Sequence, residues 1–283
     1  SDNVSDIMDY YDREVDHEQI RLERHQLEYE LTWRYLERYL PTAGAVLEIG
    51  SATGRYTVEL ARRGYAVTAV DLSPGLLERC QQNLSQAGLG GQVILVLADA
   101  RDLSPVAGVD FDAVLLMGPL YHLVVEADRH TALLQATRRL QTGGVLFSSF
   151  ISRCGILGDL MRNVPQWIEQ QEEVRSVLAR GRDPEDYPRG GFRGYFARAD
   201  EIPPLHAGVG LEMLALAGVE PAISADDESY NLLEGSTRTR WLDLLEAIST
   251  ASISGAAARR RARRFVPPSG PCTGTTSTSS SSS

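Results

Sequence analysis

Five short β-rich runs separated by helical stretches occupy residues 45–151, and this alternation limits the possible folds more than any other feature. The runs are Ala45 to Ile49, Tyr65 to Val70, Val93 to Ala98, Ala113 to Met117 and Val145 to Ile151. Strands that alternate with helices form a mainly parallel sheet with crossover helices on its faces. The chain has 283 residues, 43% of them hydrophobic, which is enough for a substantial core. We therefore predict an α/β, Rossmann-like, doubly wound fold.

The segments outside this alternation differ in composition and indicate additions to the sheet. We expect an N-terminal helical cover, a Rossmann-like core, an inserted helical and loop lid, a C-terminal part of the core and a disordered tail. Their bounds are residues 1–40, 41–153, 154–200, 201–254 and 255–283. The tail is expected because its Arg cluster runs into Pro, Gly, Ser and Thr, which cannot bury enough apolar surface to become ordered.

The turn after the first strand is rich in glycine and is preceded by a carboxylate. Gly50 and Gly54 let the backbone turn tightly and approach a ligand, whose polar groups then meet the first amides of the next helix. The spacing is GxxxG and not the GxGxxG of a dehydrogenase turn. Glu48, two places before the first glycine, suits a ligand with an ammonium group. The pattern predicts a nucleotide-like cofactor.

Two further carboxylates follow the second and third strands. Asp71 closes the second strand, where a carboxylate can accept hydrogen bonds from both hydroxyls of a ribose. Asp99 follows the third strand, where a carboxylate can accept a hydrogen bond from an adenine amino group. Each acid alone is also typical of a helix cap or a turn. Three acids at three strand ends together predict a site for an adenosine group.

These residues resemble the class I S-adenosylmethionine-dependent methyltransferase family over about residues 5 to 250. In that family an acid precedes the glycine turn, and further acids close the second and third strands. The resemblance implies S-adenosylmethionine as cofactor and S-adenosylhomocysteine as product. The cofactor-binding residues that we predict are Glu48, Gly50, Ser51, Gly54, Asp71, Leu72, Asp99, Ala100, Arg101 and Met117.

Two segments resemble a narrower subgroup of bacterial small-molecule methyltransferases that act in natural-product biosynthesis. One is the Gly-Pro-Leu-Tyr-His-Leu stretch at 118–123, and the other is the N-terminal run at 10–12 and 21–28. The family usually closes its sheet with an antiparallel sixth and seventh strand. Here the seventh falls on Gly-Ala-Ala-Ala-Arg-Arg-Arg-Ala at 255–262, and a row of charges does not suit a sheet covered on both faces. We expect this last strand to be absent or altered.

Tyr121 and His122 directly follow the fourth strand, where a methyl acceptor would arrive, and we predict both as catalytic residues. His122 suits proton removal near neutral pH, and Tyr121 can orient the acceptor or line the site. The alternative for His122 is a helix-terminal histidine bonded to the backbone. The predicted substrate-binding residues are Tyr10, Tyr11, Arg21, His25 and Tyr195.

Aromatic residues in the N-terminal segment and in the lid have two interpretations. The N-terminal residues, Arg24 among them, fold over the site as a cover, or they form an amphipathic helix with a solvated charged face. Tyr187, Phe192, Tyr195 and Phe196 form an aromatic wall over the acceptor, or they are the small core of the lid itself. An aromatic wall favours a flat acceptor such as an indole or a phenol.

Charge and cysteine content restrict the partners that we expect. The net charge of -10 argues against a surface that binds nucleic acid. Three widely spaced cysteines predict neither a disulfide framework nor a metal site. With no apolar run of about 18 residues and no leader pattern, we expect a cytoplasmic protein without membrane contact. A homodimer is compatible with the protruding N-terminal helix.

Other functions stay open at this point. An NAD(P)-dependent oxidoreductase would share the sheet and the ribose carboxylate, but the GxGxxG turn is missing and Glu48 is unexplained. A non-catalytic adenosylmethionine-binding regulatory protein would keep the pocket, but it would give no purpose to Tyr121 and His122. A nucleic-acid methyltransferase would need a basic face or a different segment after the fourth strand. The preferred function is methyl transfer to an oxygen, nitrogen or carbon atom of a small metabolite.

Overall fold

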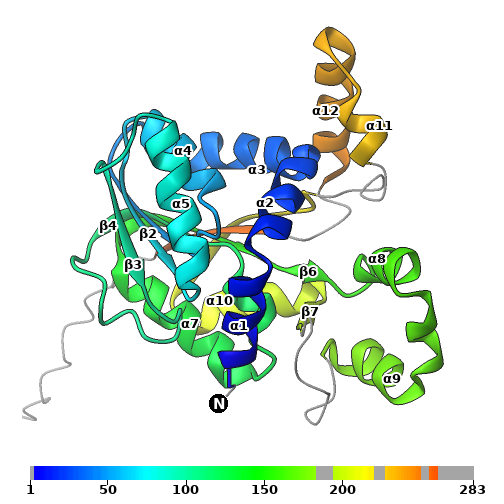
Figure 1. Ribbon diagram of the computed structural model, residues 1–283. Helices are drawn as coiled ribbons and strands as arrows, with labels where there is room; N and C mark the ends of the chain where they lie inside the picture. Colours follow the sequence, from blue (N-terminus) through cyan, green and yellow to red (C-terminus); the bar gives the residue numbers. More distant parts are fainter. Residues whose placement is uncertain (1–2, 183–193, 220–226, 250–254, 261–283) are drawn as a thin grey trace, which may run out of the picture.

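The computed structural model describes residues 3–182, 194–219, 227–249 and 255–260, and a seven-stranded sheet runs through the middle of them (Figure 1). Its strand order is β3-β2-β1-β4-β5-β9-β8. The parallel strands are β1 (Ala45–Ile49), β2 (Ala66–Asp71), β3 (Val93–Leu97), β4 (Phe111–Leu116) and β5 (Leu140–Ser149). Helices follow the strands, and the predicted Rossmann-like α/β fold is confirmed.

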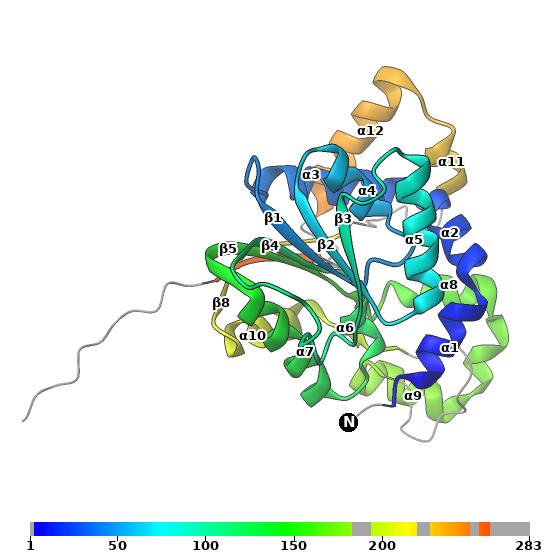
Figure 2. The ribbon, with the colours of Figure 1, turned by 60° about the vertical axis from the view of Figure 1, so that its left-hand side comes forward.

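Helices cover both faces of the sheet, as Figure 2 shows. On one face lie α3 (Gln26–Tyr39), α4 (Arg55–Arg62) and α5 (Pro74–Gln86). On the other lie α6 (Pro119–His122), α7 (Glu126–Arg139) and α10 (Ile202–Gly208), the last preceded by the 3-10 turn η2 (Ala199–Glu201). Because both faces are covered, the inner strands are nearly continuous apolar runs.

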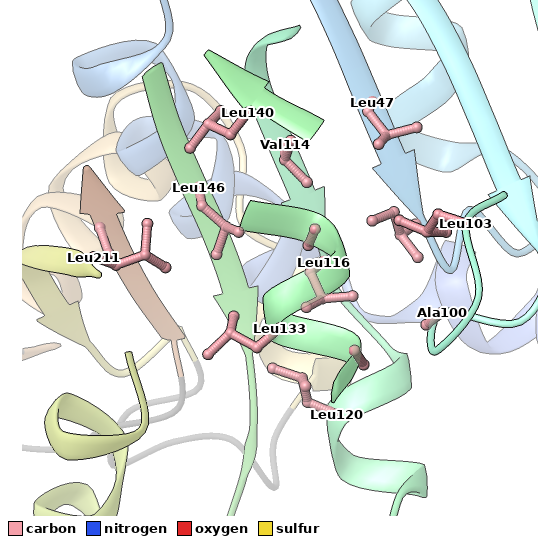
Figure 3. Close-up of a cluster of buried hydrophobic side chains, with 14 of the residues drawn as sticks. Leu47, Ala100, Leu103, Val114, Leu116, Leu120, Leu133, Leu140, Leu146 and Leu211 are labelled. Atoms are coloured by element: carbon pink, nitrogen blue, oxygen red, sulfur yellow. The ribbon is translucent and has the colours of Figure 1, made fainter. Parts of the chain in front are cut away.

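The core beneath α6 and α7 is built mainly from leucine side chains (Figure 3). Leu116 of β4 lies near Leu120 and Leu133 of the two helices, Leu47 of β1 lies near Leu103, and all five are fully buried. Burial of one such side chain stabilises the fold by about 1.5–3 kcal/mol. This packing fixes where β4 ends and therefore where the α6 residues lie.

The N-terminal helices α1 (Ser5–Arg13) and α2 (Val15–Arg24) lie along α5 (Figure 1). The carboxylate of Asp12 accepts hydrogen bonds from the amide of Gly75, at 3.0 Å, and from the hydroxyl of Ser73. Ser73 is the N-cap of α5 and also accepts from the amide of Leu76. The amides in the first turn of a helix have no hydrogen-bond partner within the helix. Asp12 binds one of these amides in α5 and so helps to cap the helix.

The predicted lid is an arm that projects from the sheet on the right of Figure 1. It contains α8 (Ile156–Asn163), the 3-10 turn η1 (Pro165–Glu169) and α9 (Gln171–Arg180). β6 (Ile151–Ser152) pairs in parallel with β7 (Phe196–Ala197) at its base. Phe196 packs with Trp167 and Val177 in the arm's own small core. Tyr187 and Phe192 lie outside the described residues.

The C-terminal elements add two antiparallel strands and a helical pair. α11 (Asp227–Asn231) and α12 (Gly235–Ile248) pack on α3 through Tyr230, Leu242 and Leu245. β8 (Leu211–Ala217) lies at the edge of the sheet and pairs with β9 (Gly255–Arg260). In the part of the chain described above, no helix has the length and apolar character that crossing a bilayer requires.

Of the two alternatives for the last strand, absent or altered, the structure excludes the first, because β9 lies between β5 and β8 and pairs antiparallel with both. Small residues occupy its middle, and Ala258, opposite Leu146, is fully buried. The arginines fall at the end of the strand, where Arg260 donates a hydrogen bond to the carbonyl of Leu140. Residues 255–260 therefore belong to the sheet and not to the predicted tail, whose remainder, 261–283, lies outside the described residues.

Candidate functional site

A pocket lies at the carboxyl ends of β1, β2, β4 and β5, beneath the N-terminal helices. One wall is the turn between β1 and α4, together with the ends of β2 and β3, and we call it the turn wall. The opposite wall is formed by α1, α2 and α3, which we call the cover. The ends of β5 and β8 close the remaining side. This is the edge of a parallel sheet at which ligands of doubly wound folds bind.

Stereochemistry requires glycine at two places in the turn wall. Gly50 has a φ of +83°, and a Cβ atom there would lie 2.6 Å from Cδ of Pro119. Gly54 has a φ of +88°, and its Cβ atom would lie 2.5 Å from Sγ of Cys80. Gly50 lines the pocket, whereas Gly54 lies behind the turn as the N-cap of α4. Gly54 therefore shapes the turn and does not reach a ligand.

Asp71 is a buried carboxylate that lines the pocket and accepts backbone hydrogen bonds. The amide of Ala52 donates to Oδ2 at 2.8 Å, and the amide of Ser73 donates to Oδ1 at 3.0 Å. Burial raises its pKa to about 6, although these hydrogen bonds favour the charged form. The carboxylate is rigidly placed and keeps lone pairs available for a ligand's hydroxyl groups.

Glu48 lies deeper in the same wall, on β1. Its Oε2 accepts a hydrogen bond from the hydroxyl of Thr57 at 2.6 Å. Burial, with the nearby charge of Asp71 as a smaller cause, raises the pKa of Glu48 to about 8, although the Thr57 hydrogen bond opposes this. A cationic group in the pocket would favour the ionised form and lower this pKa. Glu48 can therefore respond to an ammonium group on a ligand.

Asp99 and Arg101 do not have the same role. Asp99 lines the pocket, but the Arg101 guanidinium turns back onto it, with Nε 3.0 Å from each carboxylate oxygen. Arg101 also donates to Asp128 Oδ2 at 2.9 Å and does not line the pocket. The structure therefore makes Arg101 a residue that positions Asp99, and not a ligand contact as predicted. The predicted residues Leu72, Ala100 and Met117 do line the pocket.

Ser51 carries a buried polar atom without a hydrogen-bond partner. Its side chain is only 4% exposed and lines the pocket, and its Oγ has no partner among the described residues. The amides of Gly50 and Ser51 are already bonded, since both donate to the carbonyl of Val70. A buried polar group of this kind usually marks a place for a ligand or water. It supports the prediction that Ser51 contacts the cofactor.

The two predicted catalytic residues both line the pocket, and one of them meets the cover. The hydroxyl of Tyr11 lies 2.9 Å from Nε2 of His122, and the two rings meet edge to face with centroids 5.4 Å apart. Burial raises the pKa values of Tyr11 and Tyr121, so both phenols stay protonated near neutral pH. Residues 111 positions apart thus form one polar group at the end of β4.

The predicted substrate-binding residues divide into two groups. Tyr11 and Arg21 line the pocket, and Arg21 is held by two hydrogen bonds to Glu18, at 2.8 and 2.7 Å. Tyr10 and His25 do not line it. Tyr10 packs edge to face on Tyr11, with ring centroids 5.2 Å apart. His25 joins α2 to α3.

Tyr195 is also outside the pocket lining, for a visible physical reason. Its hydroxyl donates to Glu201 Oε2 at 2.6 Å, and the Arg129 guanidinium stacks on its ring at 3.5 Å. Its amide donates to the carbonyl of Tyr121 at 2.8 Å. Tyr195 therefore supports the α6 segment from behind, and the prediction that it contacts the substrate is not supported. This residue and Phe196 belong to the packing of the arm.

Several lining residues were missed by the sequence analysis. Glu18 and Glu28 come from the cover, and the charged helical pattern there does not tell which side faces the pocket. Arg55 directly follows Gly54, so its place beside the turn could have been inferred. Phe147 and Ser148 end β5, and the end of a parallel strand was itself a signal.

Ser148 has an oriented hydroxyl. Its Oγ lies 2.9 Å from Nε2 of the fully buried His206, whose Nδ1 lies 2.8 Å from the carbonyl oxygen of Ile202. A carbonyl only accepts, so Nδ1 carries the proton and Nε2 accepts from the serine hydroxyl. Burial lowers the pKa of His206, which keeps it neutral. The serine oxygen is then left as an acceptor toward the pocket.

Comparisons with known proteins found similarity in the part of the chain that contains the turn wall. Residues 46–144 match the family described as methyltransferase domain. Over 161 residues the chain is 27% identical to the tRNA 5-carboxymethoxyuridine methyltransferase of Escherichia coli, which covers 55% of this chain and 58% of that protein. It is 33% identical to the ubiquinone biosynthesis O-methyltransferase of Xylella fastidiosa over 125 residues, 42% of this chain and 47% of that protein.

Solved structures share the fold at low sequence identity. A Methanosarcina mazei S-adenosylmethionine-dependent methyltransferase matches with a TM-score of 0.53 and 18% identity, over 80% of this chain and 97% of that one. A Haloferax volcanii methyltransferase solved with the activator Trm112 matches with a TM-score of 0.60 and 15% identity, over 91% and 98%. The chain spans about half the length of the curated relatives it matches. Two of the matched structures are described as S-adenosylmethionine-dependent methyltransferases.

Proposed function

We propose that this chain transfers a methyl group from S-adenosylmethionine to an oxygen, nitrogen or carbon atom of a small organic acceptor. The observation that carries this proposal is the set of three carboxylates, Glu48, Asp71 and Asp99, that line one pocket from the ends of three adjacent strands. The matched methyltransferase domain covers the same strands. Among the described residues no cluster of histidine, cysteine and carboxylate side chains could hold a metal ion.

The turn wall fits the cofactor group by group. Asp71 would accept from the two ribose hydroxyls, and Asp99 would accept from the adenine amino group. Glu48 and the unpartnered hydroxyl of Ser51 would face the methionine end. S-adenosylmethionine supplies a methyl group made electrophilic by its bond to a sulfonium. The residues of this chain then have to hold the acceptor in line, exclude water and take up a proton where one is released.

The residues that follow β4 supply the proton acceptor. His122 lies at the pocket, and its Nε2 lies 2.9 Å from the hydroxyl of Tyr11. In our proposal His122 receives the proton of an acceptor hydroxyl or amine, either directly or through the Tyr11 hydroxyl. Tyr121, protonated because burial raises its pKa, donates a hydrogen bond that orients the acceptor. Ser148, near the end of the adjacent strand β5, offers an acceptor oxygen to the same pocket.

The lining favours a flat, partly aromatic acceptor such as an indole or a phenol. Tyr11, Tyr35 and Tyr56 line the pocket from the helices, and Phe147 lines it from the end of β5. Aromatic walls hold flat rings by burial and by stacking. Among the described residues, the support for a flat acceptor therefore comes from the N-terminal helices, α4 and the sheet, because Tyr195 and Phe196 of the arm do not line the pocket. A small natural product is consistent with this wall.

A second candidate is a base of transfer RNA, because the E. coli relative is a tRNA methyltransferase. The net charge of -10 disfavours it, since RNA binding requires clustered cations that displace counterions. We infer a soluble protein of the cytoplasm that acts on small molecules without contact to nucleic acid. Methylation of bulk tRNA by the purified chain would contradict this.

Calorimetric titration of the purified protein with S-adenosylmethionine, S-adenosylhomocysteine and NAD tests the cofactor. We expect micromolar affinity for the first two and none for NAD. NAD binding, or no binding at all, would contradict the proposal. Asp71→Ala should weaken S-adenosylhomocysteine binding by about 100-fold, because each hydrogen bond to a charged group contributes about 1.5–3 kcal/mol. His122→Ala should leave that affinity within about twofold while turnover falls about 100-fold.

A further inference from the structure

Arg55 is the first residue of α4 and lines the pocket beside the glycine turn. Its Nη1 donates one hydrogen bond, to the carbonyl of His25 at 3.0 Å. Its guanidinium stacks on the ring of Tyr29, with Cζ 4.2 Å from the ring centroid. These contacts fix the orientation of the side chain and occupy only one of its five N–H donors.

The two arginines of the pocket differ in how their charge is balanced. Arg21 is bound by both carboxylate oxygens of Glu18. Arg55 forms no ion pair with any of the described residues, and burial lowers its pKa, as does the nearby charge of Arg21. Glu28 lines the pocket from the cover and attracts Arg55 electrostatically without forming an ion pair with it. Arg55 is thus a half-buried cation that lacks a direct counter-charge.

The remaining donors of Arg55 suit one chemical class of ligand. A planar guanidinium matches the two oxygens of a carboxylate and binds them with two parallel hydrogen bonds. The first turn of α4 adds amide groups and the positive end of a helix dipole beside it. The unpartnered hydroxyl of Ser51, nearly fully buried in the loop between β1 and α4, offers a further donor. All three features favour an anion over a cation or a neutral group.

We propose that Arg55 binds a carboxylate group of the ligand at the start of α4. This inference rests on the proposed function, in which two molecules enter the pocket. The carboxylate belongs to the methionine end of the cofactor or to an acidic acceptor. The first source makes Arg55 a determinant of cofactor affinity. The second makes the acceptor an organic acid.

The cofactor experiment compares two ligands that differ only in the carboxylate. S-adenosylmethionine and decarboxylated S-adenosylmethionine are titrated into wild type, Arg55→Gln and Arg55→Lys. If the carboxylate is the cofactor's, wild type prefers S-adenosylmethionine by at least tenfold, and Arg55→Gln removes this preference without changing decarboxylated S-adenosylmethionine binding more than about twofold. Arg55→Lys keeps part of the preference, because it retains the charge without the planar fork.

The acceptor experiment uses benzoate, with benzamide as its neutral counterpart, on protein saturated with S-adenosylhomocysteine. If the carboxylate is the acceptor's, Arg55→Gln leaves the cofactor preference intact and abolishes a preference for benzoate of at least tenfold. Arg62→Gln is the matched control, since Arg62 lies on the same helix, is exposed and does not line the pocket. Arg62→Gln should change neither the preference for S-adenosylmethionine nor the preference for benzoate. Thermal unfolding of each variant checks that the fold is intact.

Two results would overturn the inference. In one, Arg55→Gln weakens both cofactor forms equally and does not change the preference for benzoate, which would make Arg55 a link between α3 and α4 only. In the other, the variant binds every probe like wild type. Failure of the proposed function looks different, because wild type itself would then not bind S-adenosylmethionine. Benzoate titration of the protein without cofactor would still decide the role of Arg55.

Discussion

The two walls of the pocket are built in different ways. The turn wall is held by backbone groups, since amides bind the carboxylate of Asp71 and a left-handed φ shapes the turn at Gly50. The cover is held by side chains that meet across long sequence distances, such as Tyr11 with His122 and Asp12 with Ser73. A wall of the first kind is intolerant of change but local in sequence. A wall of the second kind tolerates change and depends on the whole fold.

The largest expected effect comes from Gly50→Ala in the turn wall. The new Cβ atom would lie 2.6 Å from Pro119 at a φ of +83°. Left-handed backbone costs about 1–2 kcal/mol, and overpacking adds about 1–3 kcal/mol. The free energy of unfolding should fall by about 3 kcal/mol in urea titrations, and S-adenosylhomocysteine binding should weaken at least about 100-fold.

Gly88→Ala is the control for this change. Gly88 has a similar φ of +73°, but a Cβ atom there would meet nothing within 4 Å. It should lose only the conformational part, about 1 kcal/mol, and bind normally. Equal losses at the two positions would mean that the contact with Pro119 is unimportant and that the turn wall is less rigid than described.

The next effect is a pH dependence that originates in the turn wall. Burial raises the pKa of Glu48 to about 8 from an ordinary value of 4.5. Between these values the folded protein keeps a proton that the unfolded chain loses, so the free energy of unfolding decreases as pH rises. From pH 6 to pH 8 this decrease should be about 2 kcal/mol in urea titrations of the ligand-free protein.

The variant Glu48→Gln should lack this decrease, whereas Glu78→Gln, an exposed change on α5, should retain it. Asp71, whose pKa burial raises to about 6, acts in the same direction but mainly below pH 6. An identical pH profile for wild type and Glu48→Gln would show that the carboxyl is not desolvated in solution.

The smallest effect tests the cover. Asp12→Ala removes the side chain that binds the first turn of α5, which should cost about 1 kcal/mol. Asp16→Ala breaks the ion pair between Asp16 and Arg79, in which the aspartate is largely exposed, and should change the free energy of unfolding by less than about 0.5 kcal/mol. Urea unfolding of both variants measures the difference. If Asp16→Ala were the more damaging change, surface charge and not helix capping would hold the cover in place.

The turn wall could be predicted from the sequence because its residues follow from local rules. The alternation of strands and helices gives the sheet, and the carboxyl ends of parallel strands meet at one edge. Glu48, Asp71 and Asp99 therefore had to come close together, and all three line the pocket. Arg101 could not be placed in this way, since Asp128, 27 residues further on, helps to hold it away from the pocket.

The cover and the arm were less predictable. A charged helical pattern shows that α2 and α3 are helices, but it does not reveal that Glu18 and Glu28 face the pocket while His25 does not. Tyr195 was expected over the acceptor because it lies in a glycine-rich segment. Its ring is instead taken up by Arg129, a contact between distant segments. β9 was also hard to predict, because its arginines suggested that the last strand is absent or altered. Antiparallel pairing with β5 nevertheless holds this segment in the sheet.

The position of β9 affects the order in which the chain can assemble during synthesis. Among the residues that the structure describes, β8 is joined to the sheet only through β9, although it precedes β9 in the chain. The five parallel strands and the turn wall can form as soon as residue 149 has left the ribosome. Ala215 and Ala217 of β8, which line the pocket, must wait until residues 255–260 are available. A nascent chain would therefore complete the turn wall before β8 closes the remaining side of the pocket.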